Sequence, residues 1–368
     1  MEEKEVQLLF KKNIEGNFII PLKDGKIIIY YFREDYNIHI YNEKTFQKLF
    51  DINLYYSIIK FKEKIKKNDE SLFDFYHNKN CIKELENGLI LLGLDKYLMK
   101  LKLNKKDYDI KVIKKLDDII LDVNELSNKI IIIITNKNII QLEEKNEEYI
   151  VVNEYSLKEN WKIVPKSLTG KSYEDFHQYY SSYVLPNSRL LLNSFSTELS
   201  KFRLCSRQSP IIITDSKIIF IDLNNFEEIS STEIFETNIN YIILENYIII
   251  HSYENFIIYD INSLKQIQNI QKSEIFGYWR KLNNQELIEF SRDINGNKTI
   301  NIYKINNKDN NNYNLIEPYK IKIDINNIDK YSIRLYLDKL YYNGGLITLR
   351  DNRIIILCDD EIYVLQLI

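Results

Sequence analysis

Glycine, proline, cysteine and alanine are scarce in this sequence of 368 residues, which has nine glycines, five prolines and no alanine. Because glycine and proline usually mark turns, we expect Asn, Asp, Lys and Ser to mark most turns here. The three cysteines, Cys81, Cys205 and Cys358, are scattered and odd in number. Disulfide-rich secreted domains use even, patterned sets, so we expect a reducing compartment, cytoplasmic or nuclear.

The sequence also lacks long apolar runs and an excess of one charge. The longest apolar runs, such as residues 129–135, are too short to span a bilayer. The first residues, Met1 to Glu5, do not have the basic and apolar regions of a signal peptide. Fifty Lys and Arg residues face 53 Asp and Glu, a net charge of −3. Nucleic-acid binders usually carry a basic excess, so neither nucleic acid nor a membrane is an expected partner.

Patterns typical of catalysis or metal binding are missing as well. Residues 165–172, PKSLTGKS, end like a phosphate-binding loop, but Pro165 replaces the first glycine and lacks the N–H that such a loop needs. No Ser/His/Asp arrangement is visible. We therefore expect no cofactor, no metal and no enzymatic activity. The four histidines are isolated from one another and from the cysteines; they are His39, His77, His177 and His251.

Short runs rich in isoleucine and valine, four to eight residues long, fill most of the chain. β-Branched side chains pack well on a pleated surface, and many of these runs alternate with polar residues. Clusters of Asn, Asp and Ser bound them, and no long helical stripe competes with them. The sequence therefore predicts an all-β protein.

Three segments share one internal spacing, in which an Asx residue is followed by apolar residues four and seven positions later. The Asx side chain can accept backbone hydrogen bonds and begin a turn. Apolar residues three apart would lie on opposite faces of a strand unless a bulge intervenes. The segments are Asn42–Phe46–Leu49, Asp222–Phe226–Ile229 and Asp260–Leu264–Ile267.

Extending these segments outward gives seven units of about 50 residues, most with four strands. The last unit is one strand short, and residues 4–12 belong to no unit. We therefore predict one domain, 1–368, an all-β, seven-bladed β-propeller closed by the N-terminal strand pairing in the last blade. A pair of β-sandwiches or another repetitive β array is the alternative. The predicted blades are 17–53, 55–116, 118–155, 186–232, 239–270, 275–323 and 330–368, with an insertion at 156–187. Within them, residues 56–62 are expected to be a strand of the second blade, and residues 189–195 the innermost strand of the fourth.

This pattern resembles the WD-repeat β-propeller superfamily. The pairs Tyr259-Asp260 and Ile221-Asp222 stand where the Trp-Asp pair of that family ends the third strand of a blade. Tyr41-Asn42 departs further, and the Gly-His pair that usually opens a blade is missing. The resemblance implies a rigid ring that presents loops to protein or peptide partners.

Two insertions interrupt the strand rhythm, at residues 62–80 and 156–187. Long loops in compact domains are often functional, and aromatic residues are enriched at binding hot spots. An ordered loop that folds its aromatics back onto the propeller is the alternative interpretation. The candidate partner-binding residues are Trp161, Tyr173, Phe176, Tyr179 and Tyr180.

The sequence thus predicts a protein-interaction scaffold. The alternative is a propeller enzyme or small-ligand binder with a site at the central channel. A weaker alternative is a phosphoinositide-binding propeller, which would carry a Phe-Arg-Arg-Gly motif. The nearest segment, residues 290–296, lacks the arginine pair.

Overall fold

The structure of the protein is a computed structural model that describes most of the strands. The described residues are 4–14, 16, 18–30, 37–54, 56, 58–60, 81–105, 107–126, 130–135, 137–146, 148–157, 182–195, 201–203, 211–213, 216–234, 240–251, 255–271, 277–282, 286–292, 298–305, 315–319, 321–323, 346–349, 351, 353–358 and 361–367.

The chain divides into two compact units. The middle unit consists of residues 22–28 and 32–237, and the terminal unit consists of residues 1–21, 29–31 and 238–368. The first sheet along the chain has the order β2-β3-β4-β5. Its strands are β2 (Phe18–Pro21), β3 (Lys26–Tyr30), β4 (Asn37–Asn42) and β5 (Lys48–Asn53).

The middle unit holds three further four-stranded sheets and a short two-stranded ladder within its described residues. The first is β6 (Ile82–Glu84), β7 (Ile90–Leu94), β8 (Tyr97–Leu103) and β9 (Tyr108–Lys115). The second is β10 (Ile120–Leu126), β11 (Ile130–Thr135), β12 (Asn138–Lys145) and β13 (Glu148–Ser156). The third is β14 (Ser182–Leu185), β15 (Arg189–Phe195), β18 (Ser216–Asp222) and β19 (Glu227–Ile234). The ladder pairs β16 (Lys201–Arg203) with β17 (Ile211–Ile213).

The terminal unit holds two four-stranded sheets and one five-stranded sheet in the part that is described. The first is β20 (Asn240–Ile243), β21 (Tyr247–His251), β22 (Asn255–Asp260) and β23 (Gln266–Gln271). The second is β24 (Gly277–Lys281), β25 (Glu286–Arg292), β26 (Lys298–Ile305) and β27 (Leu315–Tyr319). The five-stranded sheet has the order β28 (Ile321–Ile323), β1 (Lys4–Asn13), β31 (Glu361–Leu367), β30 (Arg353–Cys358) and β29 (Leu346–Thr348).

Burial decreases from the inner strands of a sheet to its outer strand. All five residues of β7 are buried, and so are the last five of β11. In the outer strand β13, six of the nine residues are exposed. Strands covered on both faces need apolar side chains on both faces, which explains the continuous isoleucine runs. The outer strands are more exposed because one of their faces meets water.

The apolar core lies in layers between consecutive sheets. One cluster joins sheet β6–β9 to sheet β10–β13, with Leu91 and Ile133 at 0% exposure. A second cluster joins β10–β13 to β14–β19 and contains Ile132 and Ile219. In the terminal unit, a third cluster packs Ile249 of β21 against Leu287 of β25. Within each unit, the sheets joined by these clusters therefore stabilise one another, as in other repeat folds.

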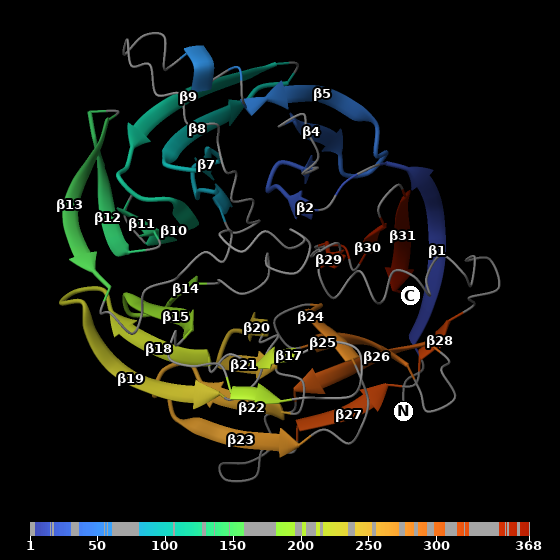
Figure 1. Ribbon diagram of the computed structural model, residues 1–368. Helices are drawn as coiled ribbons and strands as arrows, with labels where there is room; N and C mark the ends of the chain where they lie inside the picture. The colour runs from blue at the N-terminus through green and yellow to red at the C-terminus, as the bar shows by residue number, and fades with distance from the viewer. Residues whose placement is uncertain are drawn as a thin grey trace. The chain divides into compact units, whose positions relative to one another are not determined.

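The number of blades differs from the prediction: the described part of the chain forms six blades, and not seven. Six sheets in the described part of the chain have four strands each. The sheet that holds both terminal strands has five strands and is mixed, because β1 pairs parallel with β28 and antiparallel with β31 (Figure 1). Residues 321–323 belong to the predicted sixth blade, 275–323. In the structure that blade ends at Tyr319, and β28 passes to the edge of β1 instead.

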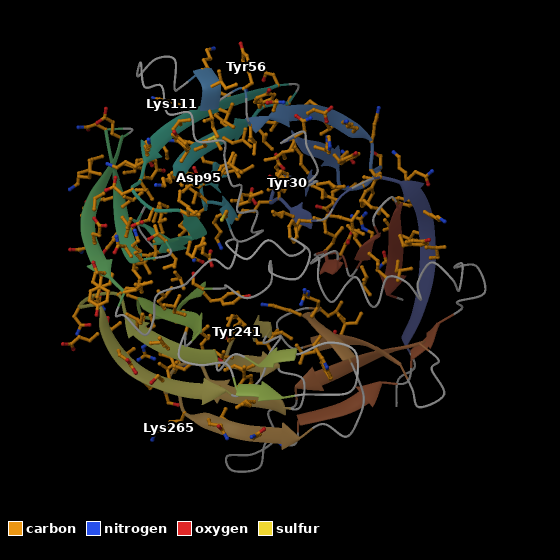
Figure 2. The ribbon with its side chains drawn as sticks, in the orientation of Figure 1. Tyr30, Tyr56, Asp95, Lys111, Tyr241 and Lys265 are labelled. Atoms are coloured by element: carbon orange, nitrogen blue, oxygen red, sulfur yellow. The ribbon has the colours of Figure 1, made fainter. Side chains whose placement is uncertain are left out.

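Two strand assignments within the blades were also wrong. The run at 56–62 was expected to be a strand, but Tyr56, which is labelled in Figure 2, and residues 58–60 are helical. The side chain of Asn53 accepts a hydrogen bond from the Tyr56 N–H at 2.8 Å, as a helix N-cap does. Residues 189–195 were expected to be the inner strand of their blade, but β14 pairs with β15 and takes that place.

Candidate functional site: Asx turns and a buried polar cluster

The three Asx residues of the repeat each begin a turn between the third and fourth strands of a blade. In the β22–β23 turn, Asp260 accepts hydrogen bonds from the N–H groups of Asn262, at 3.1 Å, and Ser263, at 2.6 Å. These backbone hydrogen bonds, led by the one from Ser263, hold the pKa of Asp260 below its usual value. Asn42 and Asp222 accept equivalent bonds.

The apolar residue four positions after each Asx residue has a left-handed backbone. The φ angles are 51° at Phe46, 59° at Phe226 and 56° at Leu264. In each case the N–H of this residue donates to the carbonyl of the Asx residue, at 2.7–2.9 Å. Their exposed fractions are only 0–8%. The turn therefore bends the chain so that an apolar side chain returns to the core.

The apolar residue seven positions after each Asx residue is the extra residue of a β-bulge. On β5, for example, Lys48 pairs with Tyr41 and Phe50 pairs with Ile40, so Leu49 has no partner in the register. A bulge accounts for the spacing of three that a regular strand cannot accommodate.

The same bulge recurs in the last hairpin of every four-stranded sheet in the described chain, and also between β1 and β31. Its extra residue is aliphatic in each case. A bulge bends and twists the outer edge strand, which discourages pairing with another chain. The extra residues are Leu49, Ile113, Val152, Ile229, Ile267, Ile316 and Leu9.

A buried polar cluster joins the inner strands of two neighbouring blades of the middle unit. It consists of Asp122 and Asn124 on β10 and Ser182 at the start of β14, with exposures of 4–7%; we call it the Asp122 cluster. One carboxylate oxygen of Asp122 accepts from the N–H and the hydroxyl of Ser182, both at 2.8 Å. The amide nitrogen of Asn124 donates to the other oxygen, at 3.2 Å, and to the Ser182 hydroxyl, at 2.8 Å.

Burial dominates the electrostatics of this cluster. It raises the pKa of Asp122 to about 7, although hydrogen bonds from Ser182 and the positive charge of Lys83 act in the opposite direction. The register of β10 against β11 shifts between Ile120 and Asp122. A bulge of this kind can re-aim the side chain that follows it, and here it precedes Asp122.

Two other carboxylates of the middle unit bond to turns of neighbouring sheets. Glu84, on β6, accepts a hydrogen bond from the Lys23 N–H at 2.8 Å. Glu125, on β10, accepts one from the Glu86 N–H at 2.7 Å. Burial raises the pKa of Glu125, and this hydrogen bond offsets part of the effect. Through these hydrogen bonds, Glu84 and Glu125 link neighbouring blades of the middle unit.

No family model and no curated protein matches the chain. Solved structures are similar to it in fold. BBS1N, solved in complex with ARL6DN, has a TM-score of 0.54 and 10% identity, covering 99% of this chain and 97% of that one. The β-propeller domain of Cps50 (Swd1) from Myceliophteria thermophila has a TM-score of 0.50 and 9% identity, covering 96% and 99%.

The Dos1 propeller has a TM-score of 0.50 and 8% identity, covering 93% of this chain and 75% of that chain. The fold is a β-propeller. The pair Tyr259-Asp260 ends β22, the third strand of its blade, as the resemblance implied. Tyr259 is buried, with 4% exposure.

The predicted partner-binding residues of the propeller lie outside the described residues. All five fall within 158–181, between β13 and β14. The other insertion, 62–80, lies outside them as well. The described chain resumes at Ser182, the residue that Asp122 holds.

The histidines do not form a common site in the described part of the propeller. His39, on β4, lies with its Nδ1 2.5 Å from a carboxylate oxygen of Asp51, which Lys48 also contacts at 2.8 Å. Partial burial would raise the pKa of Asp51, but hydrogen bonds from Lys48 and His39 outweigh it and lower the pKa. This group is an ion pair at an outer strand. His77 and His177 are outside the described residues.

The described residues contain no group of three or more His, Cys, Asp or Glu that could hold a metal ion. Among these residues, no helix is both long and apolar enough to cross a membrane. Asp122 is buried and fully engaged by neutral donors, so its raised pKa reflects a contact between blades and not a site open to substrate.

Sequence reasoning missed the Asp122 cluster. Asp122 and Ser182 are 60 residues apart, and neither stands in a recognisable motif. The one available signal was a polar pair, Asp122 and Asn124, within a buried run of β10.

Proposed function

We propose that this propeller is a scaffold inside the cell that binds other proteins or peptides and does not catalyse a reaction. The observation that carries the proposal is that the polar side chains described above hold the propeller itself together. The acids described above, of which Asp122 is buried, join blade to blade, and the Asx side chains fix the outer turns. A stiff body that holds its loops in fixed positions suits recognition of partners.

Two further observations support the proposal. BBS1N, which shares the fold at TM-score 0.54, was solved in complex with ARL6DN. Cys81 is a buried thiol in a core layer of the middle unit, and its Sγ donates to the carbonyl of Ile120 at 3.5 Å, which is consistent with a reducing compartment.

We place the partner-binding site in the insertion at 156–187. It carries the aromatic residues that typically serve as hot spots, among them Trp161, Tyr173 and Tyr179. Both its flanks are anchored in the propeller. Leu157 is buried in a core layer, with 3% exposure, and Ser182 is held by Asp122.

The test is affinity purification of the tagged full chain from its native host after crosslinking. The variant is Trp161→Ala with Tyr179→Ala, and the matched control is Phe73→Ala with Phe75→Ala in the other insertion. We expect a stable complex with the wild type and the control, and loss of its partner with the variant. Circular dichroism and the Tm should show that all three proteins are folded.

The outcomes separate the two parts of the proposal. A wild-type protein recovered as a partner-free monomer would overturn the scaffold function. A complex that survives in the variant but is lost in the control would retain the scaffold function and move the site to residues 62–80.

A further inference from the structure

The Asp122 cluster is unusual because a buried acid has only neutral hydrogen-bond donors. Its donors are the Ser182 N–H, the Ser182 hydroxyl, the Asn124 amide and the Val123 N–H. An ionised carboxylate taken out of water is costly unless a cation is paired with it. Lys83 acts on Asp122 only through its charge, because its side chain is exposed on β6.

The cluster can be satisfied in two protonation states. When Asp122 is ionised, the Ser182 hydroxyl donates to it and accepts from Asn124. A neutral Asp122 can still accept the Ser182 N–H and hydroxyl bonds, but bonds to an uncharged acceptor are weaker than bonds to a carboxylate. Adding a proton therefore keeps these bonds between β10 and β14 and removes the buried charge.

We propose that the Asp122 cluster is a proton-operated contact between two blades, which holds β10 and β14 together more tightly when Asp122 is protonated than when it is ionised. The acid is protonated and neutral in the tighter state. In the ionised state the same bonds remain, but the buried charge weakens the packing of the two blades.

The charges around Asp122 do not remove this dependence. The strands β7, β11 and β14 carry no charged side chain, and Tyr183 is the one titratable group among them. Glu125 lies on β10 itself, and Lys83 and Glu84 lie on β6, which packs against β10. Burial also raises the pKa of Glu125, so Glu125 needs its own control.

The direction of the pH effect follows from the two pKa values of Asp122. The pKa is about 7 in the folded protein and 3.8 in the reference state. Between these values the folded protein holds a proton that the unfolded chain has lost, so stability falls as pH rises and levels off above about 7. For this group alone, the equilibrium constant for unfolding should rise about tenfold between about pH 6 and pH 8.

The experiment is urea unfolding of the full chain across this pH range, for the wild type, Asp122→Asn and Glu125→Gln. Hydrogen exchange of the β10 and β14 amides, corrected for intrinsic rates, provides the local readout. We expect the tenfold rise in the wild type and in Glu125→Gln, and a flat profile in Asp122→Asn. The β14 amides should lose protection with rising pH more than those of β7.

A wild type with no pH dependence, or an Asp122→Asn variant that keeps the wild-type slope, would overturn the proposal. If Asp122→Asn does not fold, the Ser182→Ala variant tests the proposal instead. It removes the hydroxyl bond to the ionised acid and keeps the N–H bond, so the stability transition should move to higher pH. A transition at the wild-type pH in Ser182→Ala would overturn the proposal as well.

Discussion

Phe46, Phe226 and Leu264 adopt a backbone conformation that glycine usually occupies. For an L residue this conformation costs about 1–2 kcal/mol. Burying a large apolar side chain contributes about 1.5–3 kcal/mol, which offsets that cost. Phe226 also stacks on Tyr155, with ring centroids 5.7 Å apart. The strained backbone of these turns is therefore tolerated because each turn returns an apolar side chain to the core.

Because of this balance, we expect glycine to destabilise the protein less than alanine at position 226, which reverses the usual order of these two substitutions. Phe226→Ala loses the packing and keeps the backbone strain, whereas Phe226→Gly loses the packing and relieves the strain. We expect Phe226→Gly to be more stable than Phe226→Ala by about 1 kcal/mol in urea unfolding. Phe220, on the regular strand β18 with 1% exposure, is the control and should show the opposite order. The same order at both positions would contradict the role of strain.

Gly93 illustrates a second constraint at this scale, the close approach of two blades. A Cβ at Gly93 would lie 2.5 Å from the Cγ2 of Ile120, which belongs to the neighbouring blade of the middle unit. Overpacking of this kind costs about 1–3 kcal/mol. We expect Gly93→Ala to lower the free energy of unfolding by that amount.

Ile120→Ala supplies the control for this prediction. The double variant should recover part of the loss, because the alanine at position 120 makes room for the new methyl group. Additive effects of the two substitutions in urea unfolding would show that the close contact is not the cause.

At the scale of the element, the sequence predicted some features and could not predict others. The spacing of Asp260, Leu264 and Ile267 predicted a turn and allowed for a bulge, because both depend on residues close in sequence. The inner strand of the second blade was misplaced, since Asn53 starts a helix in a run whose composition equally suits a strand. The Asp122–Ser182 contact was out of reach, because it depends on how two blades meet.

The β18–β19 bulge predicts that the extra backbone residue at position 229 contributes more to the free energy of unfolding than the Ile229 side chain does. This residue is 44% exposed and is the extra residue of the β18–β19 bulge. We expect Ile229→Ser to change the free energy of unfolding by less than about 0.5 kcal/mol. Deleting Ile229 should cost more than about 2 kcal/mol, because it shifts the register and reverses the faces of Glu227 and Glu228.

Urea unfolding of both proteins measures the difference. Ile267→Ser is a useful comparison, since Ile267 is also a bulge residue but packs against a core cluster. It should be more destabilising than Ile229→Ser. A deletion of Ile229 as mild as its substitution would mean that the bulge is dispensable.

At the scale of the whole molecule, both ends of the chain meet in one sheet. β1 pairs with β31 from Val6↔Leu367 to Asn13↔Glu361, and on its other edge with β28. The ammonium of Lys11 lies 5.2 Å from the ring centroid of Tyr363. Sequence analysis could pair the two terminal segments by counting strands. It could not foresee β28, since a parallel pairing of three residues leaves no pattern in the sequence.

The terminal sheet therefore predicts that residues 1–12 are essential to the fold. Deleting them would uncover an edge of β31 whose Tyr363, Val364 and Leu365 are at most 1% exposed. An uncovered apolar edge strand promotes pairing with other chains. We expect the deleted protein to aggregate in light scattering and to lose its cooperative urea transition, whereas Leu9→Ser keeps both monomer and transition because Leu9 is 44% exposed. A truncated protein that stays monomeric with an unchanged urea midpoint would instead show that β31 and β30 hold the sheet without β1.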